Sequence, residues 1–417
     1  MKIKHLIPIL ALAIIGCKNE TQDNNVNKEA AAEEALMRKA DSLAHAFIIT
    51  DGHVDLPYRL KNEGIALITR ENGSTVIDAG IGDFDLERAR KGGLDAPFMS
   101  VYIPSELQKT GGAKALADSL IDLVKSITTT YPEHFALANN PGDVEDNFKA
   151  GKISLPMGME NGAPIEGDLK NVEYFFNRGI RYITLSHGTD NEITDASYDT
   201  TATHGGLSPF GRKVVEEMNR VGIMVDVSHI SNNAFHNVME VTKVPVIASH
   251  SSAQKFTPGF ERNMSDELIK ALGKNGGVIQ INFGSDFLDI ESQDSGNENN
   301  ERLRQELGAQ GLTEKDSAAQ PFIEQFRKEN PYKFSNVAKV ADHIDHVVEL
   351  IGIDHVGLGS DYDGVGDSLP EGLKDVADFP NLIAELLRRG YSDEDIAKIC
   401  YKNVFRVWNA VLDHAGK

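Results

Sequence analysis

Cysteine is almost absent from this chain of 417 residues, which contains only Cys17 and Cys400. So few thiols exclude a disulfide framework and a cysteine-based metal site, because either needs several thiols at defined spacings. Basic residues are also outnumbered, since 42 Lys and Arg stand against 63 Asp and Glu, for a formal net charge of −21. A surface with that charge argues against nucleic acid and anionic membranes as partners.

The apolar run near the start of the chain, residues 6–15, is too short to span a membrane as a stable helix. It follows two lysines and ends at Gly16-Cys17, so we interpret residues 1–17 as a targeting segment. A small residue before a cysteine resembles the lipobox of bacterial lipoproteins, which implies cleavage before Cys17 and lipidation of that residue. The alternative is an ordinary secretory signal with an incidental cysteine. We therefore expect a protein of the bacterial cell envelope, outside the cytoplasm, whose membrane contact is a lipid anchor.

The remaining sequence alternates short β-branched runs with segments of helical periodicity. Residues 18–30 are predicted to form a polar tether, and residues 31–417 one domain without an internal linker. Strands are predicted over residues 47–50, 96–103, 153–159, 180–186, 223–228, 244–249, 277–283 and 356–360. Helices are predicted over residues 29–45, 113–130, 170–178, 209–221, 232–241, 265–275, 336–351 and 393–408. Eight strands with intervening helices favour an α/β fold, a parallel (β/α)8 TIM barrel.

One segment interrupts this alternation after the seventh predicted strand. Residues 286–332 begin with a polar run and continue as charged sequence of helical character. Long segments of this kind inside a compact domain are uncommon and are often functional. We predict an insertion there, with a lid or a contact at the barrel rim as its role.

Ionisable side chains follow six of the eight predicted strands. They are His53 and Asp55 after the first strand, Glu160 after the third, His187 after the fourth, His229 after the fifth, His250 after the sixth and Asp361 after the eighth. Each histidine alone could be a capping or core residue. The C-terminal ends of TIM-barrel strands meet at one mouth, however, where an unpaired buried cluster would cost several kcal/mol. A bound metal would remove that cost.

The donor atoms in this set indicate the kind of metal. Imidazole and carboxylate ligands without a thiolate suit Zn²⁺, with Mn²⁺ or Co²⁺ as substitutes. A single catalytic zinc usually takes three protein ligands and a water molecule, fewer than this set offers. Two metals about 3.5–4 Å apart, bridged by a carboxylate and a hydroxide, would use the set better.

Seven motifs that contain these residues occur in a defined order. They are Asp51-Gly52-His53-Val54-Asp55, Gly158-Met159-Glu160-Asn161, Leu185-Ser186-His187, Asp226-Val227-Ser228-His229, Ser249-His250-Ser251, Arg262-Asn263 and Gly359-Ser360-Asp361-Tyr362-Asp363-Gly364. Together they resemble the membrane (renal) dipeptidase family, zinc peptidases of the amidohydrolase superfamily. The resemblance runs from about residue 47 to residue 411. One departure is that Asn282-Phe283 is followed by glycine, where some members have an aromatic residue.

The resemblance implies two Zn²⁺ ions per chain. His53 and Asp55 match the ligands of one ion, while His229 and His250 match ligands of the other. Glu160 matches the carboxylate that bridges both ions. The implied activity is hydrolysis of dipeptides by a metal-bridged hydroxide, with tolerance for a D-residue at the C-terminal side.

Three further residues match groups that act on the substrate. His187 matches the histidine that contacts the scissile carbonyl and stabilises its oxyanion. Arg262 matches the cation that holds the substrate's C-terminal carboxylate, for which a guanidinium is well suited. Asp361 matches the carboxylate that takes a proton from the hydroxide and passes it to the leaving amine.

Two other functions are compatible with the sequence. A homodimer is compatible with it as well. One rival is another binuclear metal amidohydrolase that acts on a lactone, an ester or a cyclic amide, for which Arg262 would be superfluous. The other is a non-catalytic lipoprotein that binds metal or peptide, which would have no use for His187 and Asp361.

Other histidines offer weaker candidates. His343 and His346, with Asp342 and Asp345, could form a second metal site on a helix, but we expect a solvated charged face. His204 lies in a glycine-rich loop that could line the mouth, and we do not assign it a catalytic role.

Overall fold

The structure is a computed structural model that describes residues 17–63 and 75–417. The predicted targeting segment up to Gly16 lies outside these residues. None of the helices in the described ranges combines the length and the apolar composition that a membrane span requires.

Eight parallel strands form one sheet that curves into a barrel. In spatial order they are β1 (Ile49–Val54), β2 (Leu94–Tyr102), β5 (Met157–Glu160), β6 (Ile180–Thr184), β7 (Met224–Asp226), β8 (Ile247–Ala248), β9 (Val278–Ile281) and β10 (Val356–Leu358). The last strand returns to the first, because the Asp55 N–H donates to the Tyr362 carbonyl at 2.9 Å and the Asp361 N–H donates to the His53 carbonyl at 3.1 Å. The predicted TIM-barrel fold is confirmed.

The predicted third strand is divided in two at Pro156. Its first part, β4 (Ile153–Leu155), pairs with β3 (Phe135–Leu137) in a small separate sheet, and only β5 enters the barrel. Proline has no N–H to donate to a sheet, so it marks the point at which the chain changes partners.

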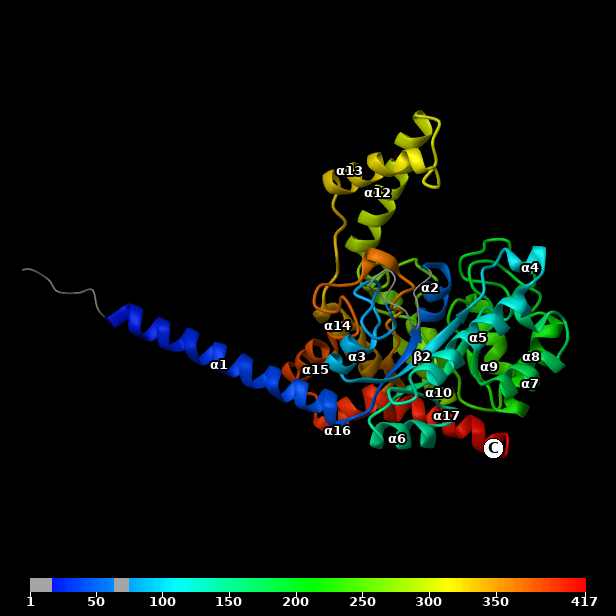
Figure 1. Cartoon of the computed structure of the whole chain (residues 1–417), viewed down its shortest axis with the longest axis horizontal. Helices are drawn as coiled ribbons and strands as arrows, with labels where there is room; N and C mark the ends of the chain where they lie inside the picture. Colours follow the sequence, from blue (N-terminus) through cyan, green and yellow to red (C-terminus); the bar gives the residue numbers. More distant parts are fainter. Residues whose placement is uncertain (1–16, 64–74) are drawn as a thin grey trace, which may run out of the picture.

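Helices cover the barrel on the outside (Figure 1). The principal ones are α2 (Leu56–Glu63), α3 (Leu86–Gly92), α5 (Ala113–Thr130), α6 (Pro141–Lys149), α7 (Lys170–Arg178), α8 (Pro209–Val221), α9 (Asn232–Val241), α10 (Asp266–Asn275), α14 (Val337–Ile351) and α15 (Phe379–Arg388). Several begin at a serine whose side chain accepts an N–H of the first turn, as Ser208, Ser231 and Ser265 do. These caps explain why the helix bounds agree closely with the pattern in the sequence.

The predicted last helix is interrupted by a π-helical turn. It consists of α16 (Asp393–Ala397), the turn η6 (Lys398–Lys402) and α17 (Asn403–His414). Cys400 lies buried in the turn, as expected of a small apolar residue, and its carbonyl accepts the Thr50 hydroxyl at 2.6 Å.

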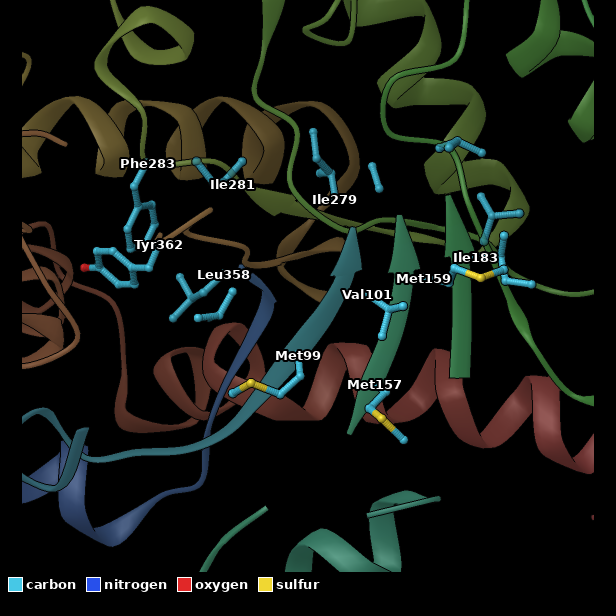
Figure 2. Packing of buried hydrophobic residues seen from close by; sticks show 14 of the residues in the cluster. Met99, Val101, Met157, Met159, Ile183, Ile279, Ile281, Phe283, Leu358 and Tyr362 are labelled. Carbon is cyan, nitrogen blue, oxygen red and sulfur yellow. The ribbon is translucent and has the colours of Figure 1, made fainter. Parts of the chain in front are cut away.

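Side chains of the strands alternate between two apolar clusters. Met99 and Val101 of β2 pair with Met157 and Met159 of β5 and pack in the large cluster shared with the surrounding helices (Figure 2). Phe98, which precedes Met99 in β2 and points to the opposite side, packs instead with Tyr182 and Trp408 at centroid distances of 5.6 and 5.2 Å. Trp408 belongs to α17, which contacts β7, β9 and β10, so this helix closes one end of the barrel.

A glycine makes room for Tyr182 between the strands. A Cβ atom at Gly158 would lie 1.9 Å from the Tyr182 ring. The residue pair therefore lets an aromatic ring occupy a place that any side chain at position 158 would block.

The insertion after β9 is a helical arm that extends from the body of the protein (Figure 1). It contains α11 (Ser285–Leu288), α12 (Ile290–Ala309) and α13 (Gln320–Glu329). The arm has a small core of its own, made of Leu303, Leu307, Ala319, Ile323 and Phe326. Its two ends are tied together, because the Tyr332 hydroxyl donates to Asp286 and the Ser335 N–H donates to the Ser285 hydroxyl at 3.0 Å.

The first helix, α1 (Cys17–Ala46), also extends from the body (Figure 1). It continues through residues 18–30, where the sequence predicts a polar tether, and its inner part packs on α15. Tethering through this segment would therefore involve a helix.

Candidate active site at the barrel mouth

The sheet places the carboxylate of Glu160 at the centre of the mouth. His53 is near the end of β1 and Asp55 directly follows that strand. The His53 Nε2 atom lies 3.5 Å from Asp55 Oδ2 and 3.4 Å from Glu160 Oε2. His53 is fully buried, and Asp55 and Glu160 nearly so. These three residues approach one another because β1 and β5 end at the same rim.

A second group of imidazoles faces the other oxygen of Glu160. Its Oε1 atom lies 3.1 Å from the Nε2 atom of His229 and 3.2 Å from that of His250. The two imidazole nitrogens are themselves 2.9 Å apart. His187 is the outermost of the group, with its Nε2 atom 3.6 Å from Glu160 Oε1 and a quarter of its side chain exposed.

Side chains inside the barrel orient two of the histidines. His53 Nδ1 lies 2.8 Å from the Tyr182 hydroxyl, and His250 Nδ1 lies 2.7 Å from the Ser249 hydroxyl. Ser249 in turn donates to Asp226 at 2.7 Å. Partners of this kind fix the ring so that its other nitrogen points toward a ligand. Reasoning from the sequence did not assign these roles, although Asp226 lies in one of the motifs quoted above.

The cluster fits a divalent metal. Within the described residues, His53 Nε2 and Asp55 Oδ1 are buried without a hydrogen-bond partner. Burial without a partner costs free energy that a bound cation would offset. The donors are imidazole nitrogens and carboxylate oxygens, and three overlapping groups of them lie close enough to hold an ion: His53–Glu160–His250, Glu160–His187–His229 and His53–Asp55–Asp361.

The protonation of His229 and His250 also suits metal binding. Burial lowers the pKa of both His229 and His250 well below the usual value, and the positive charges of neighbouring groups such as Arg262 lower it further. Burial would lower the pKa of His53, but Tyr182 and the carboxylates of Glu160 and Asp55 raise that pKa well above its usual value. Burial would raise the pKa of Glu160, but the histidines around it, His187 first, hold that pKa well below its usual value. Neutral imidazoles and an ionised carboxylate are the forms that bind metals.

Asp361, which follows β10, is the seventh ionisable residue of the cluster at the mouth. Its Oδ2 atom accepts the Asn282 amide at 2.8 Å, and burial raises the pKa of the carboxyl group to about 7. Its backbone is left-handed, with φ of 65°. A Cβ atom at Gly364 would lie 2.3 Å from both Asp361 Oδ1 and Asp55 Oδ2, so only glycine fits beside these carboxylates.

Arg262 lies behind the second group of histidines. It is nearly fully buried, and its guanidinium donates to the Ser251 hydroxyl at 2.7 Å and to the His250 carbonyl at 2.8 Å. Its Nε atom has no hydrogen-bond partner among the described residues. The guanidinium lies 5.3 Å from the ring centroid of Phe287, an aromatic residue that the arm supplies three positions after Gly284.

A cavity of about 490 Å³ opens above the cluster. Five residues of the cluster line it, together with nine others. They are Asp55, Glu160, His187, His229 and Asp361 of the cluster, and Tyr58, Tyr102, Tyr198, Asp286, Phe287, Asp363, Gly364, Val365 and Ser368. The volume suits a small molecule. The tyrosines and the two residues from the arm carried no signal in the sequence, because they come from two helices, a strand end and a loop whose relative positions depend on the fold.

The expectation for the histidines of α14 was wrong. His343 and His346 are buried rather than solvated, although Asp342 and Asp345 do face outward, where both pair with Arg389. His343 Nδ1 accepts the Ala253 N–H at 3.0 Å, and His343 Nε2 lies 3.1 Å from the Leu288 carbonyl. They belong to none of the candidate metal groups found among the described residues.

His204 does not belong to the site either. It is exposed, its Nε2 atom lies 2.8 Å from the Asn191 carbonyl, and it is not among the residues that line the cavity.

A TIM barrel with imidazoles and carboxylates converging at the C-terminal ends of its strands defines a metal-binding barrel enzyme. Comparison with known proteins identifies the family. The chain belongs to the membrane dipeptidase family, peptidase family M19, whose model matches residues 37–417. The family resemblance expected from the motifs is confirmed, and the chain is a metallo-dipeptidase.

Individual relatives agree with this assignment. An uncharacterized dipeptidase of Schizosaccharomyces pombe is 32% identical over 393 residues, which cover 90% of this chain and 84% of the relative. The crystal structure of the probable dipeptidase PvdM from Pseudomonas aeruginosa superposes with a TM-score of 0.77 at 27% identity, covering 92% of this chain and all of the other. A metallo peptidase from Rhodobacter sphaeroides, liganded with a phosphinate mimic of the dipeptide L-Ala-D-Ala, shares the fold. Its TM-score is 0.70 at 23% identity, over 88% of this chain and 99% of the other.

Proposed function

We propose that this metallo-dipeptidase holds two zinc ions and hydrolyses dipeptides, including those with a D-residue at the C-terminal side. The observation that carries the proposal is the position of Glu160, whose two oxygens face different groups of ligands. Oε2 faces His53, which is beside Asp55, and Oε1 faces His229 and His250. One carboxylate between two donor groups is the arrangement that a pair of metals uses.

The residues that would act on the substrate lie on either side of this carboxylate. Two divalent cations bound there would supply an activated water molecule and would polarise the peptide carbonyl. Asp361 would accept a proton from the attacking water and deliver it to the leaving amine, while Asn282 keeps its carboxylate in place. His187, partly exposed to the cavity, would stabilise the negative charge that develops on the carbonyl oxygen.

Arg262 would bind the C-terminal carboxylate of the dipeptide. Its buried Nε atom has no partner in the described part of the chain, and its guanidinium lies 5.3 Å from the ring centroid of Phe287, which lines the cavity. The tolerance for a D-residue is supported by the ligand of the Rhodobacter sphaeroides metallo peptidase, a mimic of L-Ala-D-Ala.

Two substitutions test these roles on metal-reconstituted protein. Arg262→Ala should mainly raise KM and remove the preference for a free over an amidated C-terminus, worth about 1.5–3 kcal/mol for a charge-assisted hydrogen bond. Asp361→Asn should lower turnover by roughly 10²–10⁴ with KM little changed. Arg212→Ala, an exposed arginine of α8, is the control that should change neither.

Elemental analysis of the same proteins separates binding from chemistry. Wild type and both variants should contain two metals per chain. A stoichiometry of one after full reconstitution with zinc contradicts the two-metal proposal, and loss of metal from Asp361→Asn would make that residue a ligand. Equal hydrolysis of free and amidated dipeptides would contradict the role of Arg262.

The proposed location is the bacterial cell envelope, with lipid on Cys17 as the anchor. The support is the lipobox-like sequence that ends at this cysteine. Cys17→Ser should release the protein from the membrane fraction or leave its signal uncleaved, and a variant that fractionates and is processed like wild type would contradict the anchor. Stable anchoring by lipid needs more than one acyl chain, which mass spectrometry of the mature N-terminus would reveal.

A further inference from the structure

The arm contributes a carboxylate to the wall of the active-site cavity. Asp286 lies in α11, at the base of the arm, and lines the cavity beside Phe287. It is mostly buried, and burial raises its pKa above the usual value. Its Oδ1 atom accepts the Tyr332 hydroxyl, and no ion pair with Lys, Arg or His is found for it among the described residues.

The other carboxylate of the wall outside the metal cluster is different. Asp363 pairs with Arg59, whose Nε atom lies 2.9 Å from Asp363 Oδ2, and accepts the backbone N–H of Asp83 at 2.6 Å. Its charge is therefore balanced within the protein. Asp286 accepts a hydrogen bond from a hydroxyl instead, which does not neutralise its charge. When ionised, it can therefore form an ion pair with a cationic group of a ligand in the cavity.

The position of Asp286 in the cavity is set by its neighbours. The next residue, Phe287, lies over the Arg262 guanidinium. Tyr198 lines the same cavity, and its ring is connected to that of Phe287 through Phe260, at centroid distances of 6.0 and 5.7 Å. Asp286 therefore lies on the side of the cavity where Arg262 is, and this is the side that receives the C-terminal residue of the substrate under the function proposed above.

We infer that Asp286 is a specificity-determining residue that selects dipeptides whose C-terminal residue has a cationic side chain. The inference rests on the proposed function, because that function orients the substrate. Phe287 and Val365 supply adjacent apolar surface to this cavity, because a Cβ atom at Gly284 would lie 2.9 Å from Phe287 and 3.0 Å from Val365. A lysine or arginine side chain matches such a wall, with a hydrocarbon stem along the apolar residues and a charged end at the carboxylate.

Specificity constants for Ala-Lys, Ala-Met and Ala-Glu test the inference. Wild type should favour Ala-Lys over Ala-Met, which has a side chain of similar length without the charge, and should disfavour Ala-Glu. Asp286→Asn keeps the shape and an acceptor for Tyr332 but removes the charge. It should reduce the ratio of kcat/KM for Ala-Lys to that for Ala-Met by about tenfold, as expected for loss of a charge-assisted hydrogen bond.

Two control variants separate this role from simpler ones. Asp294→Asn removes one charge from an exposed position of the arm, so it should leave the ratio unchanged, whereas an equal effect would show that net charge alone sets the preference. Tyr332→Phe removes the hydrogen bond but keeps the carboxylate, and should retain a preference for Ala-Lys. A ratio as low as that of Asp286→Asn would assign Asp286 a structural role and overturn the inference.

The outcomes for wild type are also distinct. Equal specificity constants for Ala-Lys and Ala-Met overturn the inference and leave the proposed dipeptidase function standing. A preference for Lys-Ala over Ala-Lys would assign the subsite to the other residue of the substrate and overturn the stated orientation. Failure to hydrolyse any dipeptide of the series, with two metals bound, would overturn the proposed function and the inference with it.

Discussion

Buried histidines occur in two regions of this protein, the barrel mouth and the helix α14, and their surroundings differ. At the mouth, His53 Nε2 and His229 Nδ1 have no hydrogen-bond partner among the described residues. On α14, both nitrogens of each histidine have one: His343 contacts Ala253 and Leu288, and His346 lies near Lys255 Nζ and Asp266 at 3.2 and 2.8 Å.

The comparison teaches that burial alone does not distinguish a metal ligand from a structural histidine. A ring whose two nitrogens both have protein partners joins segments of the chain, as His343 joins α14 to the loop after β8 and to the base of the arm. A ring with one nitrogen held by the protein and the other unpartnered is prepared for a ligand. His53 is of the second kind, since Tyr182 holds only its Nδ1 atom.

The largest effect should come from Glu160→Gln, which tests whether the mouth is the metal-binding region. This substitution removes the negative charge at the centre of the mouth. Bound metal stabilises the transition state of such reactions by several kcal/mol, so turnover should fall by roughly 10³-fold or more. The variant should also contain less metal per chain than wild type. Elemental analysis and a dipeptide assay measure both. If the variant keeps two metals and its activity, the mouth is not the metal centre.

His343→Ala should have the opposite profile, with a loss of stability and no loss of metal. It leaves the Ala253 N–H and the Leu288 carbonyl buried without partners, which should lower the free energy of unfolding by about 3 kcal/mol. Urea denaturation measures this change. His204→Ala, at an exposed histidine, is the control and should change it by less than about 0.5 kcal/mol. A loss of bound metal in the folded His343→Ala protein would contradict the structural role.

Tyr182→Phe would sharpen the comparison by removing only the hydroxyl that holds His53 Nδ1. Such partners typically contribute 10–100-fold to metal affinity, so we expect a loss of about that size. Competition with a chelator measures the affinity. Tyr174→Phe removes an exposed tyrosine hydroxyl that bonds to Asp118 and should leave the affinity as in wild type. Equal affinities for wild type and Tyr182→Phe would show that the hydroxyl does not orient His53.

The smallest effect is a pH dependence of stability that arises on α14. Burial lowers the pKa of His343 to about 3, whereas the unfolded chain should have the ordinary value of about 6.5. The unfolded state thus gains the proton first, so the stabilising contribution is present above pH 6.5 and is lost as the pH falls toward 3. Between pH 7.5 and pH 5.5, metal-free wild type should lose about 1 kcal/mol relative to His343→Gln. Parallel stability curves for the two proteins would contradict this.

The sequence predicted the helices better than the strands. The bounds of α5, α7, α8 and α9 agree with those expected, because helix periodicity and caps are local. The strands in the structure are mostly shorter than expected, since a strand ends where its partner ends, and that depends on distant segments. Pro156 is the local sign that the strand predicted over residues 153–159 is divided, because it cannot donate to a neighbouring strand.

The site shows the same division between local and distant information. Seven ionisable residues could be assigned to the mouth because each directly follows an apolar strand, and the structure brings all seven together. The partners Tyr182, Asn282 and Asp286 could not be assigned, because their roles depend on which strands and loops become neighbours. The histidines of α14 were misjudged for the same reason, since Ala253 and Leu288 are distant in sequence.

The tie between Asp286 and Tyr332 at the base of the arm has a consequence for how the chain can vary. The two ends of the arm are held together there, and the arm has its own core. The residues between Asp286 and Tyr332 therefore form an insertion that begins and ends at the same place on the barrel. Closing a loop costs only about 0.6 kcal/mol more for each doubling of its length. The arm is therefore where this chain can gain or lose length, or accept an inserted domain, at little cost to the barrel.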